Sequence, residues 1–243
     1  MTCQLQLNPQ ARFSLEKVGK ERIPILIMDD LFLSPQPLLS YAKKYQEHFL
    51  SATDYYPGRK LTVDRTIFGD VLGKLTPILK HKLELDDDLK AEHAELAVTT
   101  TLPEKLKPIQ MLPHFDSIGG KTFAFVYYCV DNSFGGTRFY RHLGTEFESM
   151  TSKRLPYYAP VIKQQAMTAK LHLSPQYNHQ DNALFEVTSE VPFQQNRAIM
   201  YPSNCFHSGV ISKLVAWQND PLACRLTFNL LFKAVTSENA SLK

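Results

Sequence analysis

The chain has 243 residues, a length that all-β barrels and sandwiches often reach within one domain, so a single domain over residues 1–243 is predicted. Hydrophobic residues make up 44% of the chain and charged residues 21%, which supplies a sizeable core and excludes a largely disordered protein. The net charge is +3 and lysine and arginine are scattered, which argues against a nucleic-acid partner because such a partner needs a basic patch.

Targeting and cysteine patterns narrow the class further. The longest uncharged stretches fall far short of the ~20 apolar residues of a membrane span, so no membrane segment is expected. Residues 1–22 are polar, resemble a loose end, and lack the apolar run of a secretory signal, which predicts a cytoplasmic protein. Cys3, Cys129, Cys205 and Cys224 share no short spacing, so neither a zinc knuckle nor a disulfide framework is expected.

The first part of the chain predicts one strand and two helices. Residues 23–28 (IPILIM) form a short apolar run that is typical of a buried strand. Ser34 is placed to cap a helix over residues 35–49, in which apolar residues recur with helical spacing. A second helical pattern covers residues 70–83, and Pro77 is expected to kink or divide it.

From residue 95 onward the pattern becomes β-rich. A polar stretch without clear period, residues 141–180, is expected to be a long insertion between strands. Helices followed by many strands favour an α+β, mainly β fold: residues 1–94 would supply a strand and supporting helices, and residues 95–234 an antiparallel barrel or jelly roll. The predicted strands are 96–102, 109–116, 122–130, 137–140, 183–191, 197–201 and 225–232.

Two segments offer metal ligands. In an extended strand, residues i and i+2 point to the same face, so His114 and Asp116 can present an imidazole and a carboxylate together while Phe115 faces the other way. A turn at the end of strand 197–201 delivers His207 just before a glycine. If the segments are neighbours, the three side chains form a 2-His-1-carboxylate triad that leaves metal positions open.

The last long strand alternates in an informative way. Arg225, Thr227 and Asn229 share one face, and the other face is apolar and must pack on the core. A guanidinium binds a carboxylate with two hydrogen bonds, so Arg225 and the Thr227 hydroxyl suit an acidic ligand. An exposed strand face with a surface ion pair is the alternative interpretation.

Taken in order, these motifs resemble those of the Fe(II)/2-oxoglutarate-dependent dioxygenases, and within them the prolyl 4-hydroxylase-like group. Pro113 before the first ligand and residues 135–140 (GGTRFY) add to a likeness that covers roughly residues 95–234. The resemblance implies a double-stranded β-helix, or jelly roll, with N-terminal helices packed on one sheet.

The resemblance also implies roles for single residues. His114, Asp116 and His207 match the iron ligands, while Arg225 and Thr227 match the pair that holds the distal carboxylate of 2-oxoglutarate. Arg225 follows His207 by 18 positions (225 − 207), which is longer than is usual in this group.

Several neighbouring residues are left with open roles. Tyr128 or Tyr127 is expected to add a hydrogen bond to the same carboxylate; the strand register decides which. Lys213 is a less suitable anchor than Arg225, because Val215 stands where a hydroxyl would be needed. Arg138 either lines the substrate mouth or forms a salt bridge at a strand edge.

The implied activity is oxidation of a substrate C–H bond by an enzyme that uses Fe(II), 2-oxoglutarate and O₂ and releases succinate and CO₂, most simply a hydroxylation. An amino-acid, peptidyl or other small-molecule substrate is expected by analogy alone. Two alternatives stay open: a cupin-like metal-binding barrel without oxygenase activity, and a non-enzymatic jelly-roll binding domain.

Overall fold

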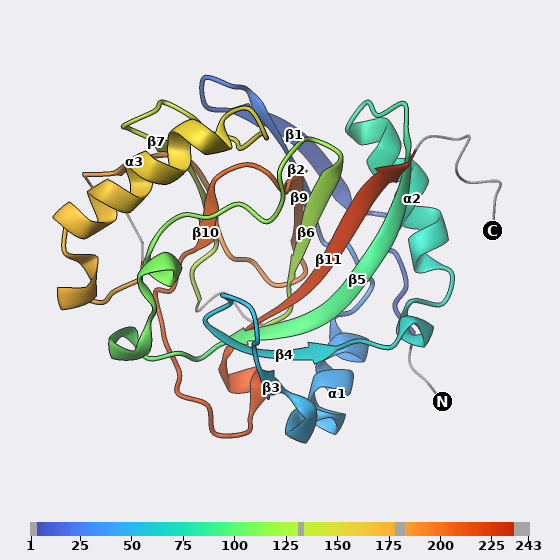
Figure 1. Cartoon of the computed structure of the whole chain (residues 1–243). Coiled ribbons are helices and arrows are strands. Elements are labelled where there is room, and N and C mark those ends of the chain that lie inside the picture. Colours follow the sequence, from blue (N-terminus) through green and yellow to red (C-terminus); the bar gives the residue numbers. More distant parts are fainter. Residues whose placement is uncertain (1–3, 131–133, 178–182, 236–243) are drawn as a thin grey trace.

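The computed structural model describes residues 4–130, 134–177 and 183–235. Its strands form two antiparallel sheets, an eight-stranded sheet in the order β1-β2-β9-β6-β11-β5-β4-β3 and a three-stranded sheet in the order β10-β7-β8 (Figure 1). The strands are β1 Arg12–Val18, β2 Ile23–Asp29, β3 Leu50–Ser51, β4 Gly58–Thr62, β5 Asp88–Thr99, β6 Thr122–Tyr128, β7 Thr137–His142, β8 Phe185–Val191, β9 Ala198–Pro202, β10 His207–Gly209 and β11 Arg225–Val235.

Both predicted helices are present. α1 covers Gln36–Lys44 and ends earlier than expected, because a short 3₁₀ turn takes over at Gln46–His48. α2 covers Val71–Lys82 with Pro77 inside it. A third helix, α3 at Leu155–Thr168, was not predicted. None of the helices in the described ranges is long and apolar enough to cross a membrane.

β11 lies near the centre of the larger sheet, and its two faces differ: one is apolar and the other is polar. It pairs with β5 on one side and with β6 on the other. Its apolar residues, among them Leu226 and Phe228, are fully buried on one face, as the alternation predicts. The Phe228 ring lies 5.4 Å from Phe68, in the segment that leads to α2, so this face packs against the N-terminal helical region.

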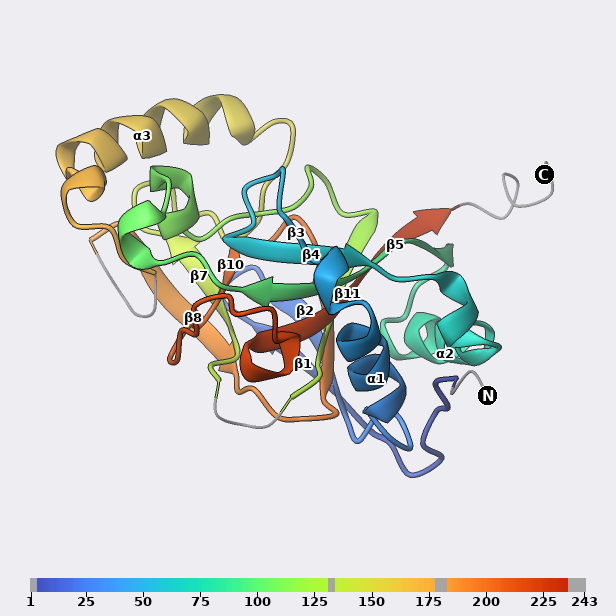
Figure 2. The same ribbon diagram turned by 90° about the horizontal axis from the view of Figure 1, so that it is seen from below.

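The helices therefore cover the outer face of the larger sheet. Leu38 of α1 and Leu75 of α2 belong to the same core cluster as the apolar side of β11. Figure 2 shows α1 and α2 grouped on one side of the molecule, with α3 at the opposite end. The opposite, polar face of β11 is turned toward the three-stranded sheet. Two facing antiparallel sheets with this outer helical layer make a double-stranded β-helix, which is mainly β as predicted.

The prediction of a strand over residues 109–116 was wrong. Pro108 begins a 3₁₀ turn that extends to Met111, and only His114 makes an isolated antiparallel bridge, to His207. Proline donates no backbone hydrogen bond, and Pro108 and Pro113 bracket the segment, so a continuous ladder cannot form there.

Three other segments contain structure that the sequence did not predict. The supposed loose end contains β1, an edge strand whose polar residues are mostly exposed. The expected insertion at 141–180 contains α3, in which only Tyr158 is buried and Leu155 and Ile162 pack beside it while partly exposed. The expected boundary after residue 94 falls inside β5, which is continuous from Asp88 to Thr99. The part of the insertion from 178 to 180 lies outside the described residues.

A buried carboxylate ties the β1–β2 hairpin to the chain that follows β7. Glu148 is 2% exposed and accepts hydrogen bonds from the backbone N–H groups of Lys20 and Glu21, both at 2.9 Å. Gly19 has φ +69°, and a Cβ on it would lie 2.1 Å from the Glu148 carboxylate. Arg141 lies 3.7 Å from the same carboxylate and balances its charge.

We expect Glu148→Ala to destabilise the fold by about 3 kcal/mol, because it removes a buried acceptor and leaves two backbone donors unpaired, while Arg141 keeps its ion pair with Glu186. Thermal unfolding would measure this as a fall of several degrees in Tm. Glu146→Ala removes a mostly exposed carboxylate close by and should leave Tm within about a degree. Equal effects of the two substitutions would contradict this account.

Candidate metal centre

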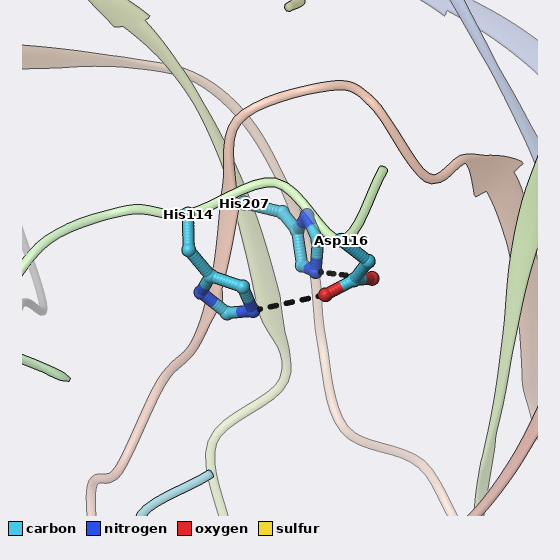
Figure 3. A group of neighbouring side chains, drawn as sticks. All are labelled: His114, Asp116 and His207. Atoms are coloured by element: carbon cyan, nitrogen blue, oxygen red, sulfur yellow. Dashed lines mark ion pairs between the residues drawn. The ribbon is translucent and has the colours of Figure 1, made fainter. Parts of the chain in front are cut away.

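Three side chains from two distant segments converge at one point between the sheets. His114 Nε2 lies 3.5 Å from one carboxylate oxygen of Asp116, and His207 Nε2 lies 3.5 Å from the other (Figure 3). One possible ligand atom from each residue lies within 4.8 Å of the other two. Among the described residues this is the one group of His, Cys, Asp and Glu with such geometry.

Backbone hydrogen bonds bring the two segments into register. His114 N–H donates to the carbonyl of His207 at 3.0 Å, and His207 N–H donates back to the carbonyl of His114 at 2.8 Å. Asp116 N–H donates to the Ser203 carbonyl at 2.7 Å. The three ligands are thus fixed relative to one another without a long strand on the first segment.

A cluster of hydroxyls supports the loop that carries Asp116. Ser117, Thr122 and Ser203 place their hydroxyl oxygens 2.6 Å from one another, and Ser117 N–H also donates to the Ser203 carbonyl. The Ser203 side chain is fully buried, and its hydroxyl also lies 3.1 Å from the Thr122 carbonyl. Because Asp116 precedes this cluster directly, the cluster limits its movement.

His207 is prepared to act as a ligand through Nε2. Its Nδ1 lies 3.0 Å from the Cys205 carbonyl, so Nδ1 carries the proton and donates it there, which leaves the Nε2 lone pair facing Asp116. Burial, with a smaller effect of His114, lowers the pKa of His207 to about 4 although Asp116 opposes the shift. The imidazole is therefore neutral at physiological pH, as a metal ligand must be.

Asp116 is ionised in the same range. Burial acts to raise its pKa, but interactions with His207 and His114 outweigh burial, and Lys60 adds a smaller effect, so the pKa falls to about 2. The site thus offers two imidazole nitrogens and one carboxylate. Phe115 faces the other way, as predicted, and packs against Phe206 with 5.8 Å between ring centroids.

The side chain of Arg225 is buried close to the glycines before β7. It is 6% exposed, and it donates from Nε to the Gly135 carbonyl at 2.9 Å and from Nη2 to the Gly136 carbonyl at 3.0 Å. No carboxylate of the described residues pairs with it. Burying a charge without a counter-ion is costly, and here two backbone carbonyls are the acceptors that the described residues provide.

The register between β6 and β11 distinguishes the two tyrosines. Tyr128 lies opposite Thr227, and its ring lies 6.0 Å from the Arg225 guanidinium carbon. Its hydroxyl donates to Thr137 at 2.9 Å. Tyr127 points to the opposite face and donates to Asn196 at 2.9 Å. Tyr128, and not Tyr127, therefore shares the face of Arg225 and Thr227.

The long interval between His207 and Arg225 is a loop that reaches the outer helical layer. Trp217 packs against Phe49 with 5.7 Å between ring centroids, and Asp220 forms an ion pair with Lys43 of α1 at 3.5 Å. This loop leaves the sheet, contacts α1 and returns through a 3₁₀ turn just before β11. Its length therefore does not change the face of β11 on which Arg225 lies.

Other candidates from the sequence take structural roles. Arg138 donates from Nε to Glu190 of β8 at 2.6 Å, which is the salt bridge of the two alternatives. Lys213 lies over the Phe134 ring. Residues 55–57 lead directly into β4, and the Tyr56 hydroxyl lies 3.0 Å from that of Thr99.

Sequence reasoning missed Lys60. It forms ion pairs with Glu95 at 2.8 Å and with Asp54 at 2.7 Å, and its positive charge helps to lower the pKa of Asp116. Only the pairing of β4 with β5 could have revealed its position.

The chain matches one family over residues 9–232, which is described as "Family of unknown function (DUF6445)". The chain belongs to this family. No curated protein matches it.

Three solved structures illustrate the folds to which this chain is similar. The first is the non-heme alpha ketoglutarate dependent epimerase SnoN from nogalamycin biosynthesis, with 14% identity, TM-score 0.49 and coverage of 88% of this chain and 78% of that chain. HygX from Streptomyces hygroscopicus, solved with nickel and 2-oxoglutarate bound, has 11% identity, TM-score 0.45 and coverage of 87% and 83%. A Pseudomonas putida prolyl-4-hydroxylase has 10% identity, TM-score 0.43 and coverage of 83% and 85%.

Removing a ligand should abolish metal binding at this site. We expect Asp116→Ala to weaken Fe(II) binding, measured by anaerobic calorimetry, by more than the roughly 10- to 100-fold typical of losing an outer-shell partner. His81→Ala, at an exposed position on α2, is the matched control and should bind metal as the parent protein does. Unchanged affinity of Asp116→Ala would mean that the three side chains do not form the metal centre.

Proposed function

We propose that the chain is an Fe(II)- and 2-oxoglutarate-dependent oxygenase that most simply hydroxylates a C–H bond of an amino-acid, peptidyl or other small-molecule substrate. One observation carries the proposal. A 2-His-1-carboxylate cluster and a buried arginine without an acidic partner project between the same two sheets. A structural metal site would need no such arginine, and a binding domain would need neither.

The donor set suits iron. His114, Asp116 and His207 supply three ligands on one side, which leaves the other positions of a six-coordinate ion free, the pattern typical of non-heme Fe(II) oxygenases. A structural zinc site would instead complete its coordination with a fourth protein ligand, and the described residues offer none. The carbonyl that orients His207 provides the outer-shell contact that such ligands normally have.

The polar face of β11 suits 2-oxoglutarate. Two of the five N–H groups of Arg225 donate to backbone carbonyls, which leaves Nη1 for a carboxylate. Thr227 is 2% exposed, and its hydroxyl has no hydrogen-bond partner among the described residues. These two groups would hold the distal carboxylate, with the ring of Tyr128 packed beside the guanidinium.

When bound, iron and 2-oxoglutarate would supply the oxidising chemistry with O₂, and succinate and CO₂ would be released. The chain's own residues bind and orient. His114, Asp116 and His207 hold the metal on one side, and Arg225 fixes the cosubstrate at a distance from it. Lys60 and Glu95 lie on the same face of the larger sheet and are placed to contact a substrate.

Anaerobic addition of 2-oxoglutarate to the Fe(II)-loaded protein should produce the metal-to-ligand charge-transfer absorption of a chelated keto acid. The control is the same titration with succinate, which has no keto group and should give no band. Bound iron without this absorption would refute the oxygenase proposal and favour a cupin-like metal-binding barrel. Failure to bind iron would favour a non-enzymatic domain.

Arg225→Gln should weaken 2-oxoglutarate binding by roughly 10- to 100-fold while iron affinity is retained, because a charge-assisted pair is lost at a distance from the metal. The charge-transfer titration measures the first quantity and calorimetry the second. Arg138→Gln removes an arginine that is ion-paired with Glu190, and it should leave 2-oxoglutarate affinity unchanged. If the two variants behave alike, Arg225 is not the carboxylate anchor.

A further inference from the structure

Tyr201, near the end of β9, is a buried residue that the motifs leave without a role. It is 2% exposed, and its ring lies nearly edge-on to Phe139 of β7, with 5.0 Å between centroids. The ring centroid of His207 in β10 is 4.9 Å away. Since β7 and β10 belong to the three-stranded sheet, the Tyr201 side chain projects from the larger sheet toward the smaller one.

Strand register places Tyr201 on the same face as the proposed cosubstrate residues. It lies opposite Ala124 of β6, which in turn lies opposite Leu231 of β11. Leu231 is four residues beyond Thr227 and six beyond Arg225, and even spacing along a strand keeps side chains on one face. Tyr201 therefore lies on the same face of the larger sheet as Arg225 and Thr227, at the end of that face that contacts the metal ligand His207.

The hydroxyl of Tyr201 has no hydrogen-bond partner within residues 4–130, 134–177 and 183–235. A buried tyrosine hydroxyl normally finds a partner, because losing hydration without a new hydrogen bond is costly. An unpartnered hydroxyl on this buried side chain therefore indicates a ligand.

The residues around Tyr201 show which end of this sheet face its hydroxyl lies near. A phenol hydroxyl can donate one hydrogen bond. The Tyr201 ring contacts the metal ligand His207, whereas the Arg225 guanidinium lies beside the ring of Tyr128. The phenol thus lies near the metal ligands, while Arg225 and Thr227 lie at the opposite end of the same sheet face.

We propose that the Tyr201 hydroxyl donates a hydrogen bond to the metal-chelating end of 2-oxoglutarate. This inference rests on the proposed function and adds a second point of attachment to the one at Arg225. With a donor at each end, this face of the larger sheet would hold both ends of the cosubstrate. Tyr201 would then be a cosubstrate-binding residue near the metal ligands.

The test compares the Fe(II)-loaded parent protein with Tyr201→Phe in anaerobic titrations with 2-oxoglutarate and with pyruvate, which has the keto-acid end and no distal carboxylate. Tyr201→Phe should bind both keto acids roughly three- to tenfold more weakly, as expected for one lost neutral hydrogen bond. The charge-transfer maximum should also shift, because a hydrogen bond to the chelating oxygens alters the energy of the keto acid's accepting orbital. Iron affinity should not change.

Tyr127→Phe is the matched control, since Tyr127 is equally buried in the same sheet but donates to Asn196 on the opposite face. It should change neither affinity nor the absorption maximum. Tyr201→Met, which fills comparable space without a donor, repeats the test if the phenylalanine variant is unstable to heat.

The outcomes separate the two proposals. If the parent protein binds iron but shows no charge-transfer band, the oxygenase proposal fails and this inference fails with it. If the parent shows the band and Tyr201→Phe matches it in affinity and maximum, the oxygenase proposal stands and the role of Tyr201 is refuted. Weaker 2-oxoglutarate binding with an unchanged maximum and unchanged pyruvate binding would place Tyr201 at the distal carboxylate and refute the assignment to the chelating end.

Discussion

The pair of backbone hydrogen bonds between His114 and His207 is the constraint on which the proposed site depends. One partner lies in a segment interrupted by prolines, and the other begins the short strand β10. Neither segment alone would fix its side chains in one arrangement, because a loop without strand hydrogen bonds has many conformations available to it. Once the two residues exchange their N–H and C=O groups, the two histidines project side by side, and a third hydrogen bond from Asp116 to the Ser203 carbonyl completes the arrangement. The hydroxyls of Ser117, Thr122 and Ser203 then stabilise that geometry from beneath.

A second constraint is electrostatic. The space between the two sheets contains a guanidinium without an acidic partner among the described residues at one end, and an ionised carboxylate between two neutral imidazoles at the other. In the proposed function, the arginine would bind an anion, and the carboxylate and imidazoles would bind a cation. A bound metal with a dicarboxylate cosubstrate would neutralise both at once. The backbone carbonyls of Gly135 and Gly136 aim the guanidinium in advance, which reduces the entropy that binding would cost.

The sequence predicted the parts of this molecule whose pattern is local. Strands β2, β6, β9 and β11 follow from apolar runs or strict alternation, and α1 and α2 follow from helical spacing. What it did not predict depends on distant contacts. β1 is an exposed edge strand, so its apolar signal is weak. α3 buries only Tyr158 and lies in a mostly polar stretch of sequence, so its helical pattern is weak. The choice between Tyr127 and Tyr128 required the pairing of β6 with β11, and the position of Tyr201 required three strands in register. The candidate ligands were identifiable from residue types and order, because their chemistry is distinctive even where the predicted strand beneath His114 was wrong.

The loop between His207 and Arg225 bears on how relatives of this chain can be recognised. Closing a flexible loop costs free energy that grows only with the logarithm of its length, about 0.6 kcal/mol for each doubling, and here contacts with α1 offset part of that cost. Evolution can therefore lengthen this loop almost freely, whereas moving Arg225 by one residue along β11 would turn its side chain to the opposite, apolar face. A search pattern that fixes the number of residues between the second histidine and the arginine will miss such chains. A pattern that allows any interval, and requires instead that the arginine and the hydroxyl residue lie two positions apart on the final strand, will find them.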